Sequence, residues 1–547
     1  MMYFVWLRKY ALLISSLTME VAMSTQLEDI QLLVRHIESM RGPWEEVWRD
    51  IKKYIIPHRG FALDNEEVST HSSHIVDATA TRALRITASG LLSGLTSPAR
   101  PWFRLYFANP EDGESVENRI WLDSVEEIVR NVLLQTGFYQ TAHAMFTELI
   151  AYGSASVYIE SHPLRDIQFY CLSCGEFAWA GDDSGAVDTV VRRYQAPIRC
   201  VAERFGVDSL SREHRELLQY NPYSLIELVH VVFPSTDHRA MPFQSITYIA
   251  STTTNDILHI GGYWEFPYIV ARWDATSSSI YGYSPAMDTL PDVKMLQEMA
   301  KSQITAIHKV VNPPMKVPAS FKTKLNLIPG GPNYVTATQN ESITPLYQIN
   351  PDVHALSTKI EDVRKAIKEG FFTDLFLMFQ GKSSVMTAQE VIERSDEKLL
   401  VLGPVIERHQ TEILTPLLKR TLAILDRAGI LPPSPEGSNL HTCSIEYVSA
   451  LAQAQKVHTG NTIRQMVKDI ALLQTLEPTV AQRVDYAQVV EELAKCNAVP
   501  TRILNVEENT IPPQQEAMEG GDVSQETTSL LMRMMEYLQR ILGRQSA

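Results

Sequence analysis

The sequence predicts an α+β protein that is predominantly helical. Apolar residues recur at helical spacing over most of the chain, whereas residues 155–272 hold short β-rich runs bounded by turn signals. Further on, two long helical stretches flank an irregular segment rich in proline and glycine. The chain has 547 residues, 45% of them hydrophobic, which is enough for several packed units.

Residues 1–25 predict either an over-extended start or a flexible tail. Arg8-Lys9 precedes a short apolar run, as in a signal peptide, but Glu20 follows the run, and Met19 and Met23 offer later starts. No other apolar stretch reaches the roughly 18 uncharged residues of a membrane span.

Helices are expected to dominate the first 150 residues. Apolar positions from Leu33 to Tyr54 follow one helix face, with a break at Gly42-Pro43 and an end at Pro57. Trp102 to Phe107 predicts a strand. Three further helices are expected, at Ile75 to Leu95, Asn118 to Leu134 and Tyr139 to Ala151.

A small β-rich subdomain is expected next. Its strands alternate with turn sequences such as the one at 181–185. The predicted strands are Val157 to Glu160, Glu176 to Ala180, Val187 to Tyr194, Leu225 to Phe233, Ser245 to Ala250 and Tyr268 to Trp273.

A helix, a projection and a second helical region follow. The first helix is expected from Pro285 to Val311, and the second region from Val353 to Ala428. Between them, the runs Met315 to Val317 and Asn333 to Thr338 predict a hairpin-like excursion. A projection of this length is usually functional or interfacial.

The second helical region is expected to break at Gly381-Lys382-Ser383-Ser384 and to bend near Gly403-Pro404. Prolines at 432, 433 and 435 mark a boundary. Later helices are expected at Leu451 to Leu476, at Val480 to Lys495 and around the apolar stripe from Leu530 to Leu542.

The charge balance argues against a tight DNA binder. Lysine and arginine total 49 and aspartate and glutamate total 64, a formal net charge of −15, whereas duplex binders neutralise several phosphates with basic side chains. The odd number of cysteines is typical of free thiols in a reducing compartment. They are Cys171, Cys174, Cys200, Cys443 and Cys496.

The sequence offers no convincing catalytic or metal motif. Gly381-Lys382-Ser383 resembles the end of a phosphate-binding loop, but Phe376 stands where that motif needs glycine. Cys171 and Cys174 have metal-ligand spacing without a second pair, so free thiols in a β-rich segment are expected. His71 and His74 predict solvated loop histidines. No cofactor is expected.

Several segments, taken together in order, resemble the head-to-tail connector, or portal, proteins of short-tailed phages over about residues 40–430. Each segment alone is a weak signal. They are Pro43-Trp44 with Tyr54 and Pro57, Ala88-Ser89-Gly90-Leu91, Ser97-Pro98, Pro101-Trp102-Phe103, Gly137-Phe138-Tyr139, Tyr152-Gly153-Ser154-Ala155, Tyr281-Gly282-Tyr283-Ser284-Pro285-Ala286, Leu290-Pro291-Asp292-Val293-Lys294, Met386-Thr387-Ala388-Gln389-Glu390-Val391 with Arg394, Leu402-Gly403-Pro404-Val405 and Pro416.

The resemblance implies a portal fold that assembles into a dodecameric ring with wing, stem, clip and crown regions around an axial channel. The regions it implies are a wing at 26–284, a stem helix at 285–312, a clip at 313–350, a second stem helix at 351–380, a tunnel loop at 381–386, a long wing helix at 387–430 and crown helices at 431–506. The resemblance does not cover the tail after about residue 500, where composition predicts a linker and a C-terminal helix at 507–547.

The resemblance also implies a role without catalysis. The ring would sit at the unique capsid vertex for packaging, retention and ejection of viral DNA, after assembly in the host cytoplasm. Its implied partners are double-stranded DNA, the terminase large subunit, tail adaptor and internal core proteins, and the major capsid or scaffolding protein. Two other classes stay open at this point. One is another phage structural protein, either a tail adaptor, which would normally be much smaller, or an internal core protein. The other is an uncharacterised enzyme, which would need convergent polar groups in a pocket.

Six lysines are candidates for facing DNA in the channel. A conduit should guide phosphates without trapping them, which suits sparse lysines in neutral or acidic surroundings. Lys382 is the first choice because a loop that interrupts a long helix can reach the axis; the alternative is a helix cap or hinge. The other candidates, which can equally be solvated or form ion pairs between subunits, are Lys301, Lys309, Lys316, Lys322 and Lys324.

Overall fold

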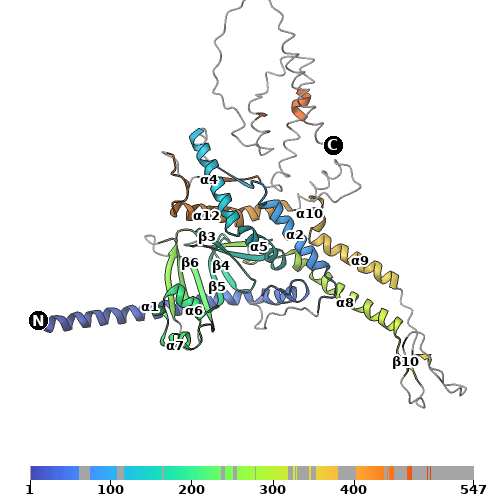
Figure 1. Ribbon diagram of the computed structural model, residues 1–547, viewed down its shortest axis with the longest axis horizontal. Coiled ribbons are helices and arrows are strands. Elements are labelled where there is room, and N and C mark those ends of the chain that lie inside the picture. The colour runs from blue at the N-terminus through green and yellow to red at the C-terminus, as the bar shows by residue number, and fades with distance from the viewer. Residues whose placement is uncertain are drawn as a thin grey trace, which may run out of the picture.

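The structure is a computed structural model that describes residues 2–60, 74–107, 116–162, 166–235, 241–250, 256–276, 279–317, 325–326, 328, 344–346, 353–379, 402–435, 440, 443–448, 463, 465–470, 489–490 and 493. Figure 1 shows a mixed body of helices and strands from which paired helices project at the lower right. The predicted α+β, predominantly helical class is confirmed.

Helix α1 (Met2–Tyr54) is continuous through Pro43, so the predicted break at Gly42-Pro43 is wrong. Ile37 and Trp48, on either side of the proline, are fully buried, and the Arg41 guanidinium donates to two backbone carbonyls at 2.9 Å. Tertiary contacts on both sides of Pro43 therefore outweigh the one helical hydrogen bond that a proline removes. The helix includes residues 2–25, and both alternatives for them, an over-extended start and a flexible tail, stay predictions.

Helix α5 (Phe138–Tyr152) lies at the centre of the core. It begins after Gly137 and ends at Gly153, whose φ values of 73° and 74° are left-handed. Its neighbours α2 (Thr79–Leu95) and α4 (Val116–Gln135) confirm the other two predicted helices of this region. One apolar cluster joins these helices to α1, to the projecting helices and to the strands beside α5.

Two antiparallel sheets form the β-rich part among the described residues. The three-stranded sheet has the order β3-β2-β9, and the five-stranded sheet runs β4-β5-β6-β7-β8. Their strands are β2 (Ser154–His162), β3 (Asp166–Leu172), β4 (Phe177–Gly181), β5 (Val187–Pro197), β6 (Leu225–Pro234), β7 (Phe243–Ile249), β8 (Ile257–Tyr263) and β9 (Tyr268–Arg272). All six predicted strands are confirmed, whereas β3 and β8 were missed.

Helices cover both faces of the five-stranded sheet. Apolar residues of α1, among them Ile30 and Val34, pack on one face. The short helices α6 (Ile198–Phe205) and α7 (Arg212–Tyr220) were not predicted; residues of α6 and of the segment that leads into α7 pack on the other face.

The projection consists of α8 (Pro285–Val311) and α9 (Val353–Gly370), with a short hairpin at its tip (Figure 1). The bounds of α8 match the prediction. In the hairpin, β10 (Met315–Lys316) pairs with β11 (Thr344–Pro345), which confirms the excursion. The second predicted run, 333–338, lies outside the described residues.

The second helical region is interrupted at Phe371-Phe372, ten residues before the predicted break. Phe371 is fully buried, and Phe372 has a left-handed φ of 57° before α10 (Thr373–Phe379) begins. The Thr87 hydroxyl donates to the Phe371 carbonyl at 2.5 Å. A contact from α2 thus holds a turn that helical periodicity does not reveal. The predicted break at 381–384 lies outside the described residues.

Beyond the undescribed residues 380–401, a helix at 402–409 passes through the π-helical turn η3 (Gln410–Leu414) into α12 (Thr415–Arg427). Gly403-Pro404 lies at the start of the described helix, directly after the undescribed residues, so the bend predicted there stays a prediction. Strand β12 (Cys443–Tyr447), also missed, pairs with β1 (Phe103–Phe107), the predicted strand. The predicted terminal helix lies outside the described residues.

Candidate functional site

The outer half of α8 leaves the core. Its buried residues end at Ala300, and beyond that point Ile304, Ile307, Val310 and Val311 are 46%, 44%, 50% and 67% exposed. Three of them, at 304, 307 and 311, share one face because they are spaced three and four residues apart. We call these four residues the stem stripe. It gives the projecting helix an apolar surface that needs a partner.

The predicted channel lysines fall on the same projection. Lys301 and Lys309 are exposed on α8, and Lys316 is exposed on β10. Within the described part of the chain, none of the three forms an ion pair, whereas Lys294, nearer the core, donates to Asp50 at 2.6 Å. Lys322, Lys324 and Lys382 lie outside the described residues.

A polar clamp fixes the two projecting helices where they enter the core. The buried Gln297 of α8 accepts from the amides of Val76 and Asp77 at 2.7 and 2.8 Å and donates to the Asp77 carbonyl at 2.8 Å. Arg364 of α9 donates to the Asp77 carboxylate at 2.9 and 2.6 Å. Burial opposes ionisation of Asp77, but hydrogen bonds from Thr79 and Arg364 outweigh it and lower its pKa. Both helices are thereby tied to the segment that enters α2.

The backbone crosses itself closely where α5 ends and the chain approaches α8. A Cβ on Gly153 would overlap the carbonyl of Gly282, and one on Gly282 would overlap the carbonyl of Gly153. The Gly282 amide donates to the Ser154 hydroxyl at 2.9 Å, and the Ser284 hydroxyl donates to the Ala151 carbonyl at 2.9 Å. Two segments that carried the family resemblance, at 152–155 and 281–286, therefore form one joint at the base of the projection.

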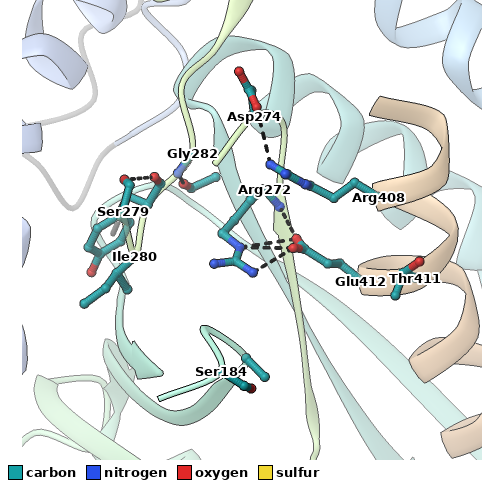
Figure 2. Close-up of polar contacts among 12 residues, drawn as sticks. Ser184, Arg272, Asp274, Ser279, Ile280, Gly282, Arg408, Thr411 and Glu412 are labelled. Carbon is teal, nitrogen blue, oxygen red and sulfur yellow. Dashed lines mark hydrogen bonds and ion pairs between the residues drawn. The ribbon is translucent and has the colours of Figure 1, made fainter. Parts of the chain in front are cut away.

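A second joint connects strand β9 to the helix after residue 401 (Figure 2). Glu412 accepts from the Arg272 guanidinium at 2.7 and 3.2 Å and from the Arg272 amide at 3.1 Å. Arg408, one turn earlier, pairs with Asp274 at 3.5 Å. Sequence reasoning missed this joint because nothing local links residues 140 positions apart.

Aromatic rings pack around Trp273, the residue between Arg272 and Asp274. Trp273 makes an edge-on contact with the His409 ring at 5.5 Å and stacks near Phe372 at 6.3 Å. Burial, followed by the charge of Arg408, lowers the pKa of His409 to about 3, so this histidine is neutral. His409 is therefore a core residue, and neither of its ring nitrogens has a hydrogen-bond partner among the residues that the structure describes.

The thiols and histidines in the described ranges form no metal site. Cys171 and Cys174 are free and at least half-buried, as predicted, and burial raises the pKa of both thiols. His74 lies exposed beside Tyr54, and His71 is outside the described residues. Among the residues that the structure describes, no group of three or more His, Cys, Asp and Glu side chains is arranged to hold a metal ion. None of the helices in the described ranges is long and apolar enough to cross a membrane.

The joints and the clamp fix helices relative to one another, and a projecting helix pair with an apolar face extends from them. These features define a structural protein built for assembly. A family model described as "Bacteriophage head to tail connecting protein" matches residues 27–504, so the chain belongs to this family of phage connectors. It has the portal role and is a structural component of the phage particle, not an enzyme.

Relatives with assigned names agree. The chain is 35% identical over 478 residues to a "Probable portal protein" of Bordetella phage BPP-1, covering 85% of this chain and 86% of that protein. It is 30% identical over 499 residues to the "Portal protein" of Salmonella phage epsilon15, covering 88% and 90%. Among solved structures, a chain from the neck of an empty gene transfer agent particle aligns with a TM-score of 0.36 at 10% identity, covering 71% and 86%.

Proposed function

We propose that copies of this chain close into a ring, expected to be a dodecamer, around an axial channel at the unique capsid vertex. Double-stranded viral DNA passes through the channel during packaging and ejection and is retained between them. The wing comprises residues 26–284 and 387–430, the stem 285–312 and 351–380, the clip 313–350, the tunnel loop 381–386 and the crown 431–506. Residues 507–547 form a linker and a C-terminal helix.

The proposed partners follow from this position. The terminase large subunit docks during packaging, and tail adaptor and internal core proteins bind the finished connector. The major capsid or scaffolding protein contacts the ring at the vertex, after assembly in the host cytoplasm. No catalytic residue of this chain is required, because the packaging motor is a separate protein.

The stem stripe is the observation that carries the proposal. An exposed row of branched aliphatic residues on a projecting helix is costly in water unless another surface covers it. If each subunit's stripe packs on the next subunit's stem pair, a head-to-tail contact of this kind closes into a ring when the rotation closes. The exposed lysines on the same projection supply sparse positive charge beside DNA.

Negative-stain imaging of the purified protein tests the ring. We expect wild-type rings with an axial hole and loss of rings when Ile304 and Ile307 are both replaced by aspartate, since a charge buried in the contact is strongly unfavourable. Ile120→Asp is the matched control, because Ile120 is 63% exposed on α4, away from the stem. A wild-type monomer under packaging-like conditions, or an assembly without an axial hole, contradicts the proposal.

A second arm tests the lysines. We expect the triple variant Lys301→Gln, Lys309→Gln and Lys316→Gln to form rings but to retain less DNA in packaged heads, because phosphate contacts are lost. Lys382→Glu should behave in the same way. The exposed Lys419 of α12, replaced by glutamine, is the control. Unchanged DNA retention in the triple variant and in Lys382→Glu would contradict the proposed role of the lysines but not the proposed ring.

A further inference from the structure

The π-helical turn η3 has an unusual hydrogen-bond pattern at a defined place. The Thr415 amide donates to the carbonyl of Gln410, five residues earlier, and not to that of Thr411. A π turn accommodates one residue more than an α-helix over the same length and is rare unless tertiary contacts hold it. Contacts with other elements are therefore expected to hold the turn at 410–414.

Two strands, β9 and β12, supply those contacts. From β9, Arg272 binds the Glu412 carboxylate through its guanidinium and its amide, as described above. From β12, the Tyr447 hydroxyl donates to the Gln410 carbonyl at 3.4 Å and lies 2.6 Å from the Thr415 hydroxyl. The β9 contact is the stronger, because it is a forked ion pair whose side chains are only 14% and 19% exposed.

Two local costs adjoin this turn. Neither ring nitrogen of the buried His409 has a hydrogen-bond partner among the described residues, and an unsatisfied buried polar group is unfavourable. Phe372, in ring contact with the same Trp273, holds a left-handed φ of 57° that bulky residues avoid. An unsatisfied histidine and one strained backbone position, both in contact with Trp273, indicate an arrangement imposed from outside the helix.

We propose that Glu412 and Arg272 are positioning residues that lock the register of the helix at 402–409 against the stem. The inference rests on the proposed conduit function. The mechanical path runs from Glu412 to Arg272, then through the Trp273 amide, which donates to the Gly153 carbonyl at 2.9 Å, to the crossing of Gly153 and Gly282 before α8. Loss of the lock lets the π turn rewind as α-helix.

Helix geometry sets the rotation and translation that this rewinding would cause. A change of one residue in register rotates the residues before the turn by about 100° and moves them by about 1.5 Å along the helix axis. His409 then loses its contact with Trp273, and the helix at 402–409 changes its rotation and axial position relative to α8. In a ring, every subunit undergoes the same change, so DNA retention is expected to fall while the ring persists.

The test compares Glu412→Ala with Glu407→Ala in the full-length protein. Glu407 is an exposed acid on the same helix, without an ion pair among the described residues. In Glu412→Ala rings we expect roughly tenfold faster amide hydrogen exchange at 411–415, because loss of a partly buried ion pair raises the open population by about that factor. Cryo-electron microscopy of the same rings should show an α-helical turn, and packaged heads should retain less DNA. Glu407→Ala should match the wild type in all three measurements.

Two outcomes overturn the inference. One is a π turn that persists with unchanged exchange in Glu412→Ala, and the other is a lower melting temperature without any change of register or retention. If Glu412→Ala does not assemble, exchange is measured on Glu412→Gln, which keeps a hydrogen-bond acceptor but loses the charge; unchanged exchange there also overturns it. A wild type that forms no rings contradicts the proposed function instead, and the exchange comparison still tests the lock.

Discussion

At Gly153, one missing side chain decides whether two distant segments can meet. The residue combines a left-handed φ of 74° with a backbone crossing that leaves no room for a Cβ beside the Gly282 carbonyl. The sequence places this glycine in a segment that resembles the family, but residue spacing predicts neither its left-handed φ nor its contact with Gly282. Arg272 and Glu412 give no sequence signal at all.

Replacing Gly153 separates these two effects. We expect Gly153→Ala to lower the free energy of unfolding by about 3 kcal/mol, from left-handed strain plus overpacking. Gly185→Ala is the matched control: its φ is 80° but nothing lies within 4 Å of the added Cβ, so strain alone should cost about 1 kcal/mol. Urea unfolding measures both. Equal losses in the two variants would show that the close crossing is unimportant.

Among the elements, α8 is one whose bounds apolar periodicity predicts correctly. Its apolar spacing predicts its bounds, and the structure adds that the Ser284 hydroxyl, which directly precedes the helix, accepts from the Met287 amide at 3.0 Å. The turn at Phe371-Phe372 and the unbroken path of α1 through Pro43 were not predictable in this way. In both, hydrogen bonds with remote segments, from Thr87 to the Phe371 carbonyl and from Arg41 to the Gly175 carbonyl, overrule the local propensity.

The clamp at the base of the projection is testable at the same scale. We expect Asp77→Ala to destabilise the fold by about 2 kcal/mol, since Arg364 and the amide of Thr79 both lose a largely buried acceptor. Glu361 is the second acid paired with Arg364, and its side chain is 64% exposed, so Glu361→Ala should cost under about 0.5 kcal/mol. Chemical unfolding of both variants provides the measurement. A similar loss in both would mean that Arg364, rather than Asp77, organises the clamp.

For the molecule as a whole, two buried carboxyl groups predict how stability depends on pH. Burial raises the pKa of Glu148 to about 7 against the opposing charge of Arg59. Burial likewise raises the pKa of Glu126 to about 7, although the Leu105 amide donates to it at 2.6 Å. The ordinary value is 4.5, so between about pH 4.5 and 7 the folded protein binds protons that the unfolded chain does not.

Stability from these two groups is therefore fully present below about pH 4.5 and declines as the pH rises to about 7. We expect the wild type to lose on the order of 4 kcal/mol more between pH 5.5 and 7.5, about 2 kcal/mol from each group, than the variant Glu126→Gln with Glu148→Gln, whose amides do not titrate. Urea midpoints at the two pH values measure the difference. The exposed Glu117→Gln should keep the wild-type slope, and parallel slopes in wild type and double variant would refute the assignment.

The sequence by itself determined the fold class, the six β-rich runs, the bounds of α8, the hairpin excursion and the family, because these follow from local periodicity, turn residues and ordered motif fragments. Tertiary structure alone decided the path through Pro43, the turn at Phe371-Phe372, the π turn at 410–414, the joint of 152–155 with 281–286 at the base of the projection, and the joint of Arg272 with Glu412. Each of these depends on hydrogen bonds, ion pairs or close backbone contacts between segments far apart in the chain, and such contacts leave no periodic trace in either segment.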